Sequence, residues 1–169
     1  MNVAIQLLGD PLAVLSSTRS QGEVSPNGAH IDGARVRCVV SGADLRPHTR
    51  WRDARHHLRL SVEEAVHAVR RTSSVRHLVV VFAQGSHRAS RVERFVMSAL
   101  NRTHASLERD VARDVEFTAV NVTDCANPEM LATRLLEVSR STVTHGVVVL
   151  GWDEVIGQPV GSAARRALS

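Results

Sequence analysis

The feature that most constrains the fold of this chain is an apolar run at residues 78–82, followed by a glycine turn and a helical pattern. The run LVVVF is too short for a helix and rich in β-branched residues, which is typical of a strand buried on both faces. Ser90 and Glu93 have the spacing of a capping box, so we predict a helix that begins near Ser90. Its apolar face would consist of Val92, Phe95, Val96, Ala99 and Leu100. Strand, turn and helix predict half of a βαβ unit.

Similar patterns alternate through the rest of the chain from residue 61 onward. Ser61 and Glu64 have a second capping-box spacing and predict a helix start, preceded by a short strand near residues 58–60. Residues 116–122 and 146–150 predict two further strands, and Asn127 followed by Pro128 predicts the start of a helix between them. This alternation of helices and strands indicates a parallel sheet with right-handed crossovers.

The N-terminal part is less regular. Residues 2–8 predict a strand that stops at Gly9, and residues 16–33 predict a long exposed loop. Residues 34–41 alternate arginine with apolar side chains, which favours an edge strand with one solvated side. The arginine-rich stretch that follows predicts irregular structure, and the tail at residues 159–169 could form a short helix or stay loose.

Together these patterns predict one α/β domain over residues 1–169. Its architecture would be a Rossmann-like three-layer sandwich around a mainly parallel sheet. The N-terminal strands could add an antiparallel edge to that sheet.

The charge composition excludes several classes of enzyme. All 21 basic residues are arginine, and the chain has no lysine and no tyrosine. Without lysine, a phosphate-binding P-loop, a Schiff-base enzyme and a kinase are excluded. The isoelectric point of 10.7 follows from the absence of groups that titrate between cysteine and arginine, because the net charge is only +4. The high isoelectric point alone therefore does not indicate a nucleic-acid partner.

Compartment and redox state follow from two further absences in the sequence. No apolar run approaches the ~20 residues of a membrane helix, and the first basic residue is Arg19, so we expect neither a membrane span nor a signal peptide. Cys38 and Cys125 lack a CxxC spacing, so neither a zinc site nor a disulfide framework is indicated. We expect a cytoplasmic protein with no membrane partner.

Ligands of open α/β sheets bind at the carboxyl ends of the strands, so the loops at these ends are the candidate sites. The loop after residue 82 joins a helix start to basic side chains, a combination that holds phosphate or carboxylate. Neighbouring strand ends add a carboxylate and an aromatic ring. The candidate anion site comprises Gly85, Ser86, His87, Arg88, Asp124 and Trp152. The alternative is that this loop only turns the chain and that Trp152 packs in the core.

Catalytic and metal sites have weaker support in the sequence. Cys125 could be a nucleophile only beside an activating base, and no histidine is tied to it by spacing, so we assign no catalytic residue and no cofactor. Zinc ligands of the right type occur together in one segment, although a solvated basic surface explains them as well. They are His48, Asp53, His56 and His57.

The same segment is crowded with arginine and is the best candidate for contact with an acidic or nucleic-acid partner. Its arginines are Arg46, Arg50, Arg52, Arg55 and Arg59. The aromatic residues that single-strand binders interleave with such arginines are nearly absent, and only Trp51 is present.

The sequence phrases RHLVVVFAQG, VEFTAVNVTD and THGVVVLGWDE, in that order, resemble the Rossmann-like half of short-chain dehydrogenases. The resemblance covers residues 75–158 and is greatest to the non-catalytic structural region of polyketide ketoreductases. It implies a scaffold without cofactor chemistry, because the glycine-rich dinucleotide turn and the catalytic tyrosine and lysine of that family have no counterpart here.

Three functional hypotheses follow from the sequence. The first is a non-catalytic structural, assembly or binding subunit, which would form a homo-oligomer or join a larger protein assembly. The second is a small enzyme or sensor that binds a phosphorylated or carboxylated small molecule at residues 85–88. The third is a nucleic-acid or ribonucleoprotein subunit that uses the arginine-rich segment.

Overall fold

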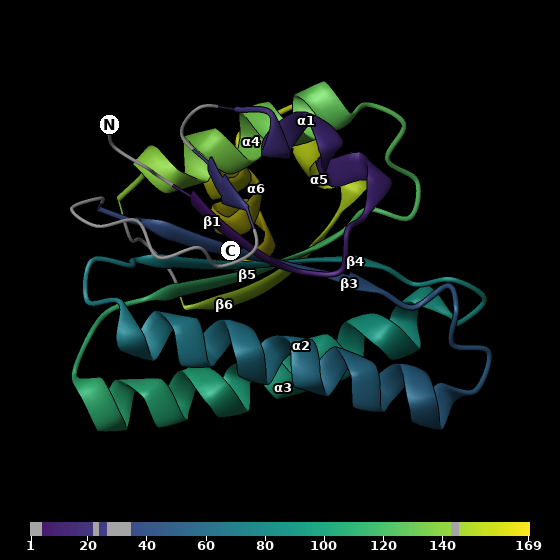
Figure 1. Cartoon of the computed structure of the whole chain (residues 1–169), viewed down its shortest axis with the longest axis horizontal. Coiled ribbons are helices and arrows are strands. Elements are labelled where there is room, and N and C mark those ends of the chain that lie inside the picture. Colours follow the sequence, from purple (N-terminus) through teal and green to yellow (C-terminus); the bar gives the residue numbers. More distant parts are fainter. Residues whose placement is uncertain (1–4, 22–23, 27–34, 143–145) are drawn as a thin grey trace.

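The computed structural model describes residues 5–21, 24–26, 35–142 and 146–169. It shows a six-stranded sheet with helices on both faces (Figure 1). The strands are β1 (Ile5–Gly9), β2 (Val24–Pro26), β3 (Cys38–Asp44), β4 (His77–Ala83), β5 (Glu116–Asn121) and β6 (Val147–Gly151). Their spatial order is β2-β1-β3-β4-β5-β6, and every pairing is parallel. The α/β class and the parallel sheet are confirmed, whereas the antiparallel edge is wrong.

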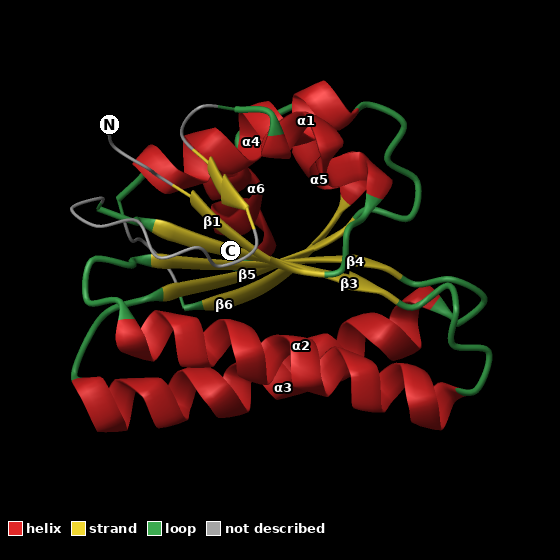
Figure 2. Cartoon of the chain, viewed as in Figure 1, coloured by secondary structure: helices red, strands yellow, loops and turns green. Residues whose placement is uncertain are grey.

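Helices cover both faces of this sheet (Figure 2). α2 (Trp51–Arg71) and α3 (Ala89–Val111) lie on one face, and the other face carries α1 (Ser16–Arg19), α4 (Pro128–Arg140), α5 (Trp152–Ile156) and α6 (Val160–Ala167). A 3-10 turn, Ala13–Leu15, precedes α1. Among the described helices, none combines the length and the apolar character that crossing a bilayer requires.

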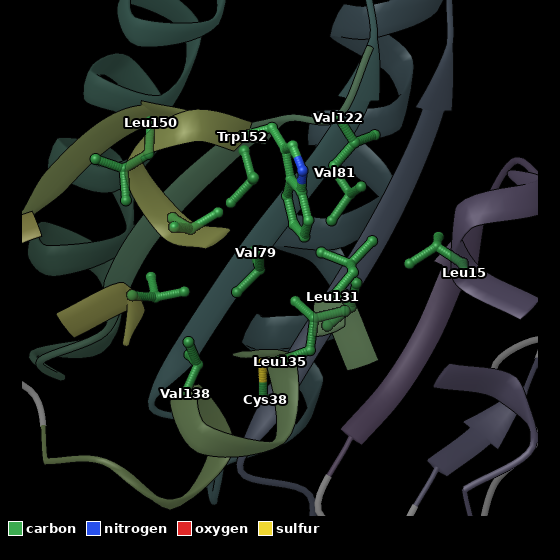
Figure 3. Close-up of a cluster of buried hydrophobic side chains, with 14 of the residues drawn as sticks. Leu15, Cys38, Val79, Val81, Val122, Leu131, Leu135, Val138, Leu150 and Trp152 are labelled. Carbon is green, nitrogen blue, oxygen red and sulfur yellow. The ribbon is translucent and has the colours of Figure 1, made fainter. Parts of the chain in front are cut away.

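Three of the inner strands, β3, β4 and β5, are buried on both faces, as predicted for residues 78–82. Alternate residues of β4 contribute to two separate cores: Val79 and Val81 face α4, while Leu78, Val80 and Phe82 face α2 and α3. Figure 3 shows the first of these cores, in which Leu131 and Leu135 of α4 pack on the sheet.

The crossover β5–α4–β6 departs from the expected topology. From β3 to β6 the chain moves one strand at a time in the same direction across the sheet. The first two connections, through α2 and α3, cross on one face, whereas the third, through α4, crosses on the other face. This crossover therefore has the opposite hand to the two before it, so the prediction that all crossovers are right-handed is wrong. α1 has only four residues and cannot cover this face of the sheet alone. α4 packs beside α1, and α6 covers β6.

Three local predictions are also wrong. Residues 34–41 were expected to form an edge strand, but β3 lies between β1 and β4. The 16–33 loop contains α1 and β2, and its residues 22–23 and 27–34 lie outside the described part of the chain, as do residues 2–4 of the first predicted strand. Residues 58–60 belong to a helix, because α2 starts ten residues before Ser61, whose hydroxyl donates to the His57 carbonyl.

The capping boxes also need correction. Neither Arg50, which precedes α2, nor Arg88, which precedes α3, makes a side-chain capping bond. Glu93 instead accepts a hydrogen bond from Asn121 at 3.2 Å. The cap predicted for α4 is confirmed, since Asn127 Oδ1 accepts from the Met130 amide at 3.0 Å. The tail forms a helix, α6.

Gly9 allows the carboxyl ends of β1 and β3 to come together. It has a φ of 77°, and a β-carbon at this position would meet the Gly42 carbonyl oxygen. The Asp10 amide donates to that same oxygen at 2.9 Å, and Asp10 Oδ2 accepts from the Asp44 amide at 2.7 Å. Gly9 therefore lets the Asp10 carboxylate reach the backbone amide of Asp44 at the end of β3.

We predict that Gly9→Ala lowers the free energy of unfolding by more than the ~1–2 kcal/mol of a left-handed alanine, because the added methyl also meets the backbone of β3. The matched control is Gly157→Ala, where φ is −96° and nothing lies within 4 Å of the new β-carbon. The control should change stability by less than ~0.5 kcal/mol. Urea denaturation of both variants tests this, and equal losses would contradict the strand contact described.

Candidate functional site

A cavity of about 260 Å³ opens at the carboxyl edge of the sheet, among the segments that follow β1, β3, β4 and β5. We call it the switch-point cavity, because the strand order reverses between β1 and β3, and such reversals place ligands in α/β sheets. Its buried lining is apolar and comes from Leu12, Ala83 and Val122. Its more exposed lining includes Arg46, Gly85, Thr123 and Cys125. The cavity thus combines an apolar interior with a polar mouth.

Asp44 fixes the guanidinium of Arg46 at this mouth. Arg46 Nε lies 2.8 Å from Asp44 Oδ1 and Nη2 lies 2.8 Å from Oδ2, and the Arg46 amide also donates to Oδ1 at 3.0 Å. Hydrogen bonding to Arg46 holds the pKa of the Asp44 carboxyl below its ordinary value of 3.8, so Asp44 is ionised at neutral pH. One edge of the guanidinium fork is occupied, and among the described residues Nη1 on the other edge has no partner, so its donors remain for a ligand.

Gly85 forms the turn that brings the β4 end against Arg46. Its φ is 63°, and a β-carbon there would lie 2.9 Å from the Arg46 α-carbon. Within the described residues, the amides of Gly85 and Ser86 donate to no acceptor, whereas the His87 amide closes the turn onto the Gln84 carbonyl at 3.3 Å. A left-handed residue with free neighbouring amides is an arrangement that binds anions.

Asn121 at the end of β5 and Thr123 just after it support the turn through hydrogen bonds. Asn121 Nδ2 donates to Gln84 Oε1 at 2.7 Å, and Asn121 Oδ1 accepts from Thr123 Oγ1 at 2.7 Å. Thr123 Oγ1 in turn accepts from the Gln84 amide at 3.0 Å. This network ties the ends of β4 and β5 together, and it holds Gly85 at the cavity mouth.

A histidine–carboxylate pair connects β1 to α2 close to this edge. His57 Nε2 lies 2.5 Å from Asp10 Oδ2, and the ring of His48 lies 4.6 Å from that of His57. Asp10 also accepts from the Asp44 amide, so the pair supports the loop that carries Arg46. None of these three side chains lines the cavity. Their shared contribution is to position the β3 end.

The predicted anion site is only partly assembled. Gly85 lines the cavity, and Ser86 and Arg88 are exposed at the start of α3. His87 is committed elsewhere, with Nε2 2.6 Å from the His48 carbonyl oxygen, while Asp124 is exposed in the turn after β5.

Trp152 is not available to a ligand, because it is 7% exposed and packs in the core with Val81 and Val122 (Figure 3). The alternative that this residue packs is therefore the one the structure shows.

The thiol of Cys125 lines the cavity but is poorly suited to nucleophilic chemistry. Burial raises its pKa above the ordinary value of 9.0, so it is protonated at neutral pH. Its recorded contact is a weak one to the Asn127 carbonyl oxygen at 3.7 Å. Among the described residues, no histidine contacts this thiol, and a general base for it is therefore missing.

Most of the arginine-rich segment lies in the first half of α2, and Arg50 directly precedes that helix. Arg50, Arg52, Arg55 and Arg59 line a second and larger cavity, of about 690 Å³, between α2 and α3. We call it the α2–α3 groove. Arg46, the fifth arginine of the predicted set, instead lies at the switch-point cavity.

The candidate metal ligands are divided between these two places. His48 and His57 lie near Asp10, while Asp53 and His56 line the α2–α3 groove. Across the described residues, no group of three or more histidine, cysteine or acidic side chains is placed to hold a metal ion. The four residues therefore form no shared site in this structure.

Sequence reasoning missed Asp44, Asp10 and Leu12 as parts of the site. Asp10 and Asp44 each stand at the carboxyl end of a strand, and that position was a usable signal. It was overlooked because β3 was expected to end at residue 41 instead of Asp44.

Comparison with protein-family models, with curated proteins and with solved structures gave no match to this chain. The resemblance to short-chain dehydrogenases accordingly stays a prediction.

We predict that iodoacetamide alkylates Cys125 in the folded protein and leaves Cys38 intact, because Cys38 is fully buried. The raised pKa of Cys125 means that alkylation should be slow at pH 7 and accelerate as the pH rises beyond 9, where the thiolate forms. Intact-mass spectrometry should show one adduct in buffer and two in urea, and Cys125→Ser should abolish the native adduct. A native adduct on Cys38 would contradict the packing of β3.

Proposed function

We propose that this protein is a binding module that holds a small ligand bearing a carboxylate or phosphate in the switch-point cavity. The observation that carries the proposal is the Arg46–Asp44 fork, which presents free guanidinium donors beside an apolar cavity. The unpaired amides of Gly85 and Ser86 would add two neutral donors to the same anionic group. The apolar lining would enclose the remainder of the ligand.

The size of the cavity limits the ligand. A volume of about 260 Å³ equals that of about nine waters at ~30 Å³ each, and it lies just under the ~300–1,000 Å³ usual for drug-sized ligands. A short organic acid or a small phosphate ester fits this volume, whereas a dinucleotide does not. The proposal is thus consistent with a chain that lacks a dinucleotide fingerprint.

Binding without chemistry is favoured by the groups at the mouth. Arg46 and Cys125 are the titratable side chains among the described lining residues, and neither can act as a general base at neutral pH. The nearest histidine–carboxylate pair, Asp10 with His57, is engaged in holding the backbone of β3.

An assembly role has less support. The large apolar side chains exposed in the described part of the chain are Leu60, Ile156 and Leu168. Leu60 lies on α2, on the opposite face of the sheet from α5, which carries Ile156, so the three do not form one patch. Light scattering that shows a stable oligomer would revive this hypothesis.

We predict that Arg46→Ala weakens binding of the cognate acid ten- to a hundredfold, the effect of losing a charged hydrogen bond of ~1.5–3 kcal/mol. Asp44→Asn should weaken it by a smaller factor, since the positive charge stays but its orientation is lost. The control is Arg71→Ala, which removes an exposed arginine at the far end of α2.

The measurement is two-dimensional NMR titration with inorganic phosphate, butanoate and phosphoglycolate as probes. We expect amide shifts at residues 85–86 and protection of Cys125 from iodoacetamide by the probe that binds. Shifts that are unchanged in Arg46→Ala, or an absence of shifts with every probe at millimolar concentration, would overturn the proposal.

A further inference from the structure

The α2–α3 groove carries a concentration of positive charge that the proposed ligand site does not use. Arg50, Arg52, Arg55 and Arg59 line it from the α2 side, and Arg102 lines it from α3. Asp53 is the carboxylate among the lining residues, so five guanidinium groups face one acid. Like charges gathered in a recess repel one another, and a bound polyanion would relieve that repulsion.

These arginines are not neutralised by the protein itself. Within the described residues, Arg50, Arg52, Arg55 and Arg102 make no ion pair, and Arg59 lies 3.8 Å from Glu63 across the exposed helix surface. An exposed pair at that distance contributes little binding energy and would not compete with a phosphate. Arg59 Nη2 also lies 3.0 Å from His56 Nδ1, another residue of the groove lining, so Arg59 has one nitrogen engaged. The other four guanidinium groups have no ion-pair partner among the described residues.

Three of these arginines form a row along α2. Arg52, Arg55 and Arg59 follow one another at three and four residues, so they lie along one side of the helix. Seven residues at ~1.5 Å each span about 10 Å. The row therefore presents three guanidinium groups, each of which can contact one phosphate of a bound strand.

The groove is poorly suited to a protein segment. Phe95 and Ala99 are the apolar side chains that line it, and both are only partly buried. A docked peptide helix would need several apolar pockets at helical spacing, and protein interfaces generally have an apolar core. An aromatic ring beside a basic groove is one of the elements from which single-strand binding sites are built, because such rings stack on bases.

The aromatic ring is fixed in place by its neighbour. The rings of Trp51 and Phe95 meet edge to face at 5.8 Å, and the Arg91 guanidinium lies 5.7 Å above the Trp51 ring. Because Trp51 begins α2 and Phe95 lies in α3, this contact joins the two helices at one end of the groove. The contact with Trp51 therefore holds the Phe95 ring in place beside the groove that it lines.

We infer that the α2–α3 groove binds the phosphodiester backbone of single-stranded nucleic acid without reading its sequence. The recess lies between two helices and admits one strand, whereas a duplex would require a protruding element to enter its grooves. The groove lies between α2 and α3, whereas the switch-point cavity lies at the carboxyl edge of the sheet. Binding at one site can therefore be lost without loss of binding at the other.

The test is fluorescence anisotropy with a labelled twelve-nucleotide oligo(dT), titrated with the whole chain from 50 to 200 mM NaCl. Contacts with three phosphates predict a linear plot of log affinity against log salt with a slope of about −2, from ~0.7 per phosphate on single strands. The variant Arg55→Ala/Arg59→Ala should bind at least tenfold more weakly, and its slope should be shallower by about 1.4.

Two further variants separate the groove from net charge and from fold damage. Arg165→Ala/Arg166→Ala on α6 removes the same charge from the opposite face and should leave affinity unchanged. Phe95→Leu should weaken binding about tenfold with the salt slope unchanged, because stacking contributes affinity and releases no counterions. Circular dichroism melts verify that each variant folds.

Four outcomes would overturn the inference. They are no binding at 50 mM NaCl, equal losses in the α2 and α6 double variants, tighter binding of a twelve-base-pair duplex than of the single strand, and equal binding of a glutamate-rich peptide. The last two would redirect the groove to duplex or to an acidic protein. Ligand titration of Arg55→Ala/Arg59→Ala with the small acids should be normal in every case, which keeps this test separate from that of the cavity.

Discussion

The structure depends on one constraint, which is that β3, β4 and β5 have no face that water can touch. Val79, Val80 and Val81 are each at most 1% exposed, and successive residues point to opposite sides of the sheet. Each apolar face therefore needs its own layer of helices, and a sheet with one solvated side is excluded for this chain. The two cores follow directly from that requirement.

The need to cover both faces explains the unusual crossover. α2 and α3, with 21 and 23 residues, are long enough to cover one face between them. The other face begins with a helix of four residues, which leaves the strands near β1 and β3 open. α4 fills that space beside α1, and the β5 to β6 connection takes the opposite hand in consequence. Leu131, Leu135 and Val138 of α4 are buried in the core of that face, although ~98% of such crossovers take the other hand.

The same architecture sets the positions of the two candidate sites. Parallel strands bring Asp10, Asp44 and Gly85 to one edge, where the reversal of strand order leaves a cavity. The pairing of α2 with α3 leaves a groove on the outside of the sandwich, and its arginines come from α2 residues that the core does not need. α2 therefore contributes apolar side chains such as Leu58 to the core and exposed arginines such as Arg59 to the groove.

Local patterns in the sequence determined that residues 78–82 and 116–122 form strands and that α3 and α4 exist, because short β-branched runs and helical apolar spacing act over neighbouring residues alone. They did not determine where α2 begins, since its first turns look polar and irregular until Ala54 and Leu58 meet the sheet. Tertiary structure alone decided that β3 is central, that one crossover changes hand, and that Asp44 holds Arg46 while His87 turns to the His48 carbonyl. These features depend on contacts between residues that are distant in sequence, or on which face of the sheet still needs a covering helix. No pattern of neighbouring residues contains that information.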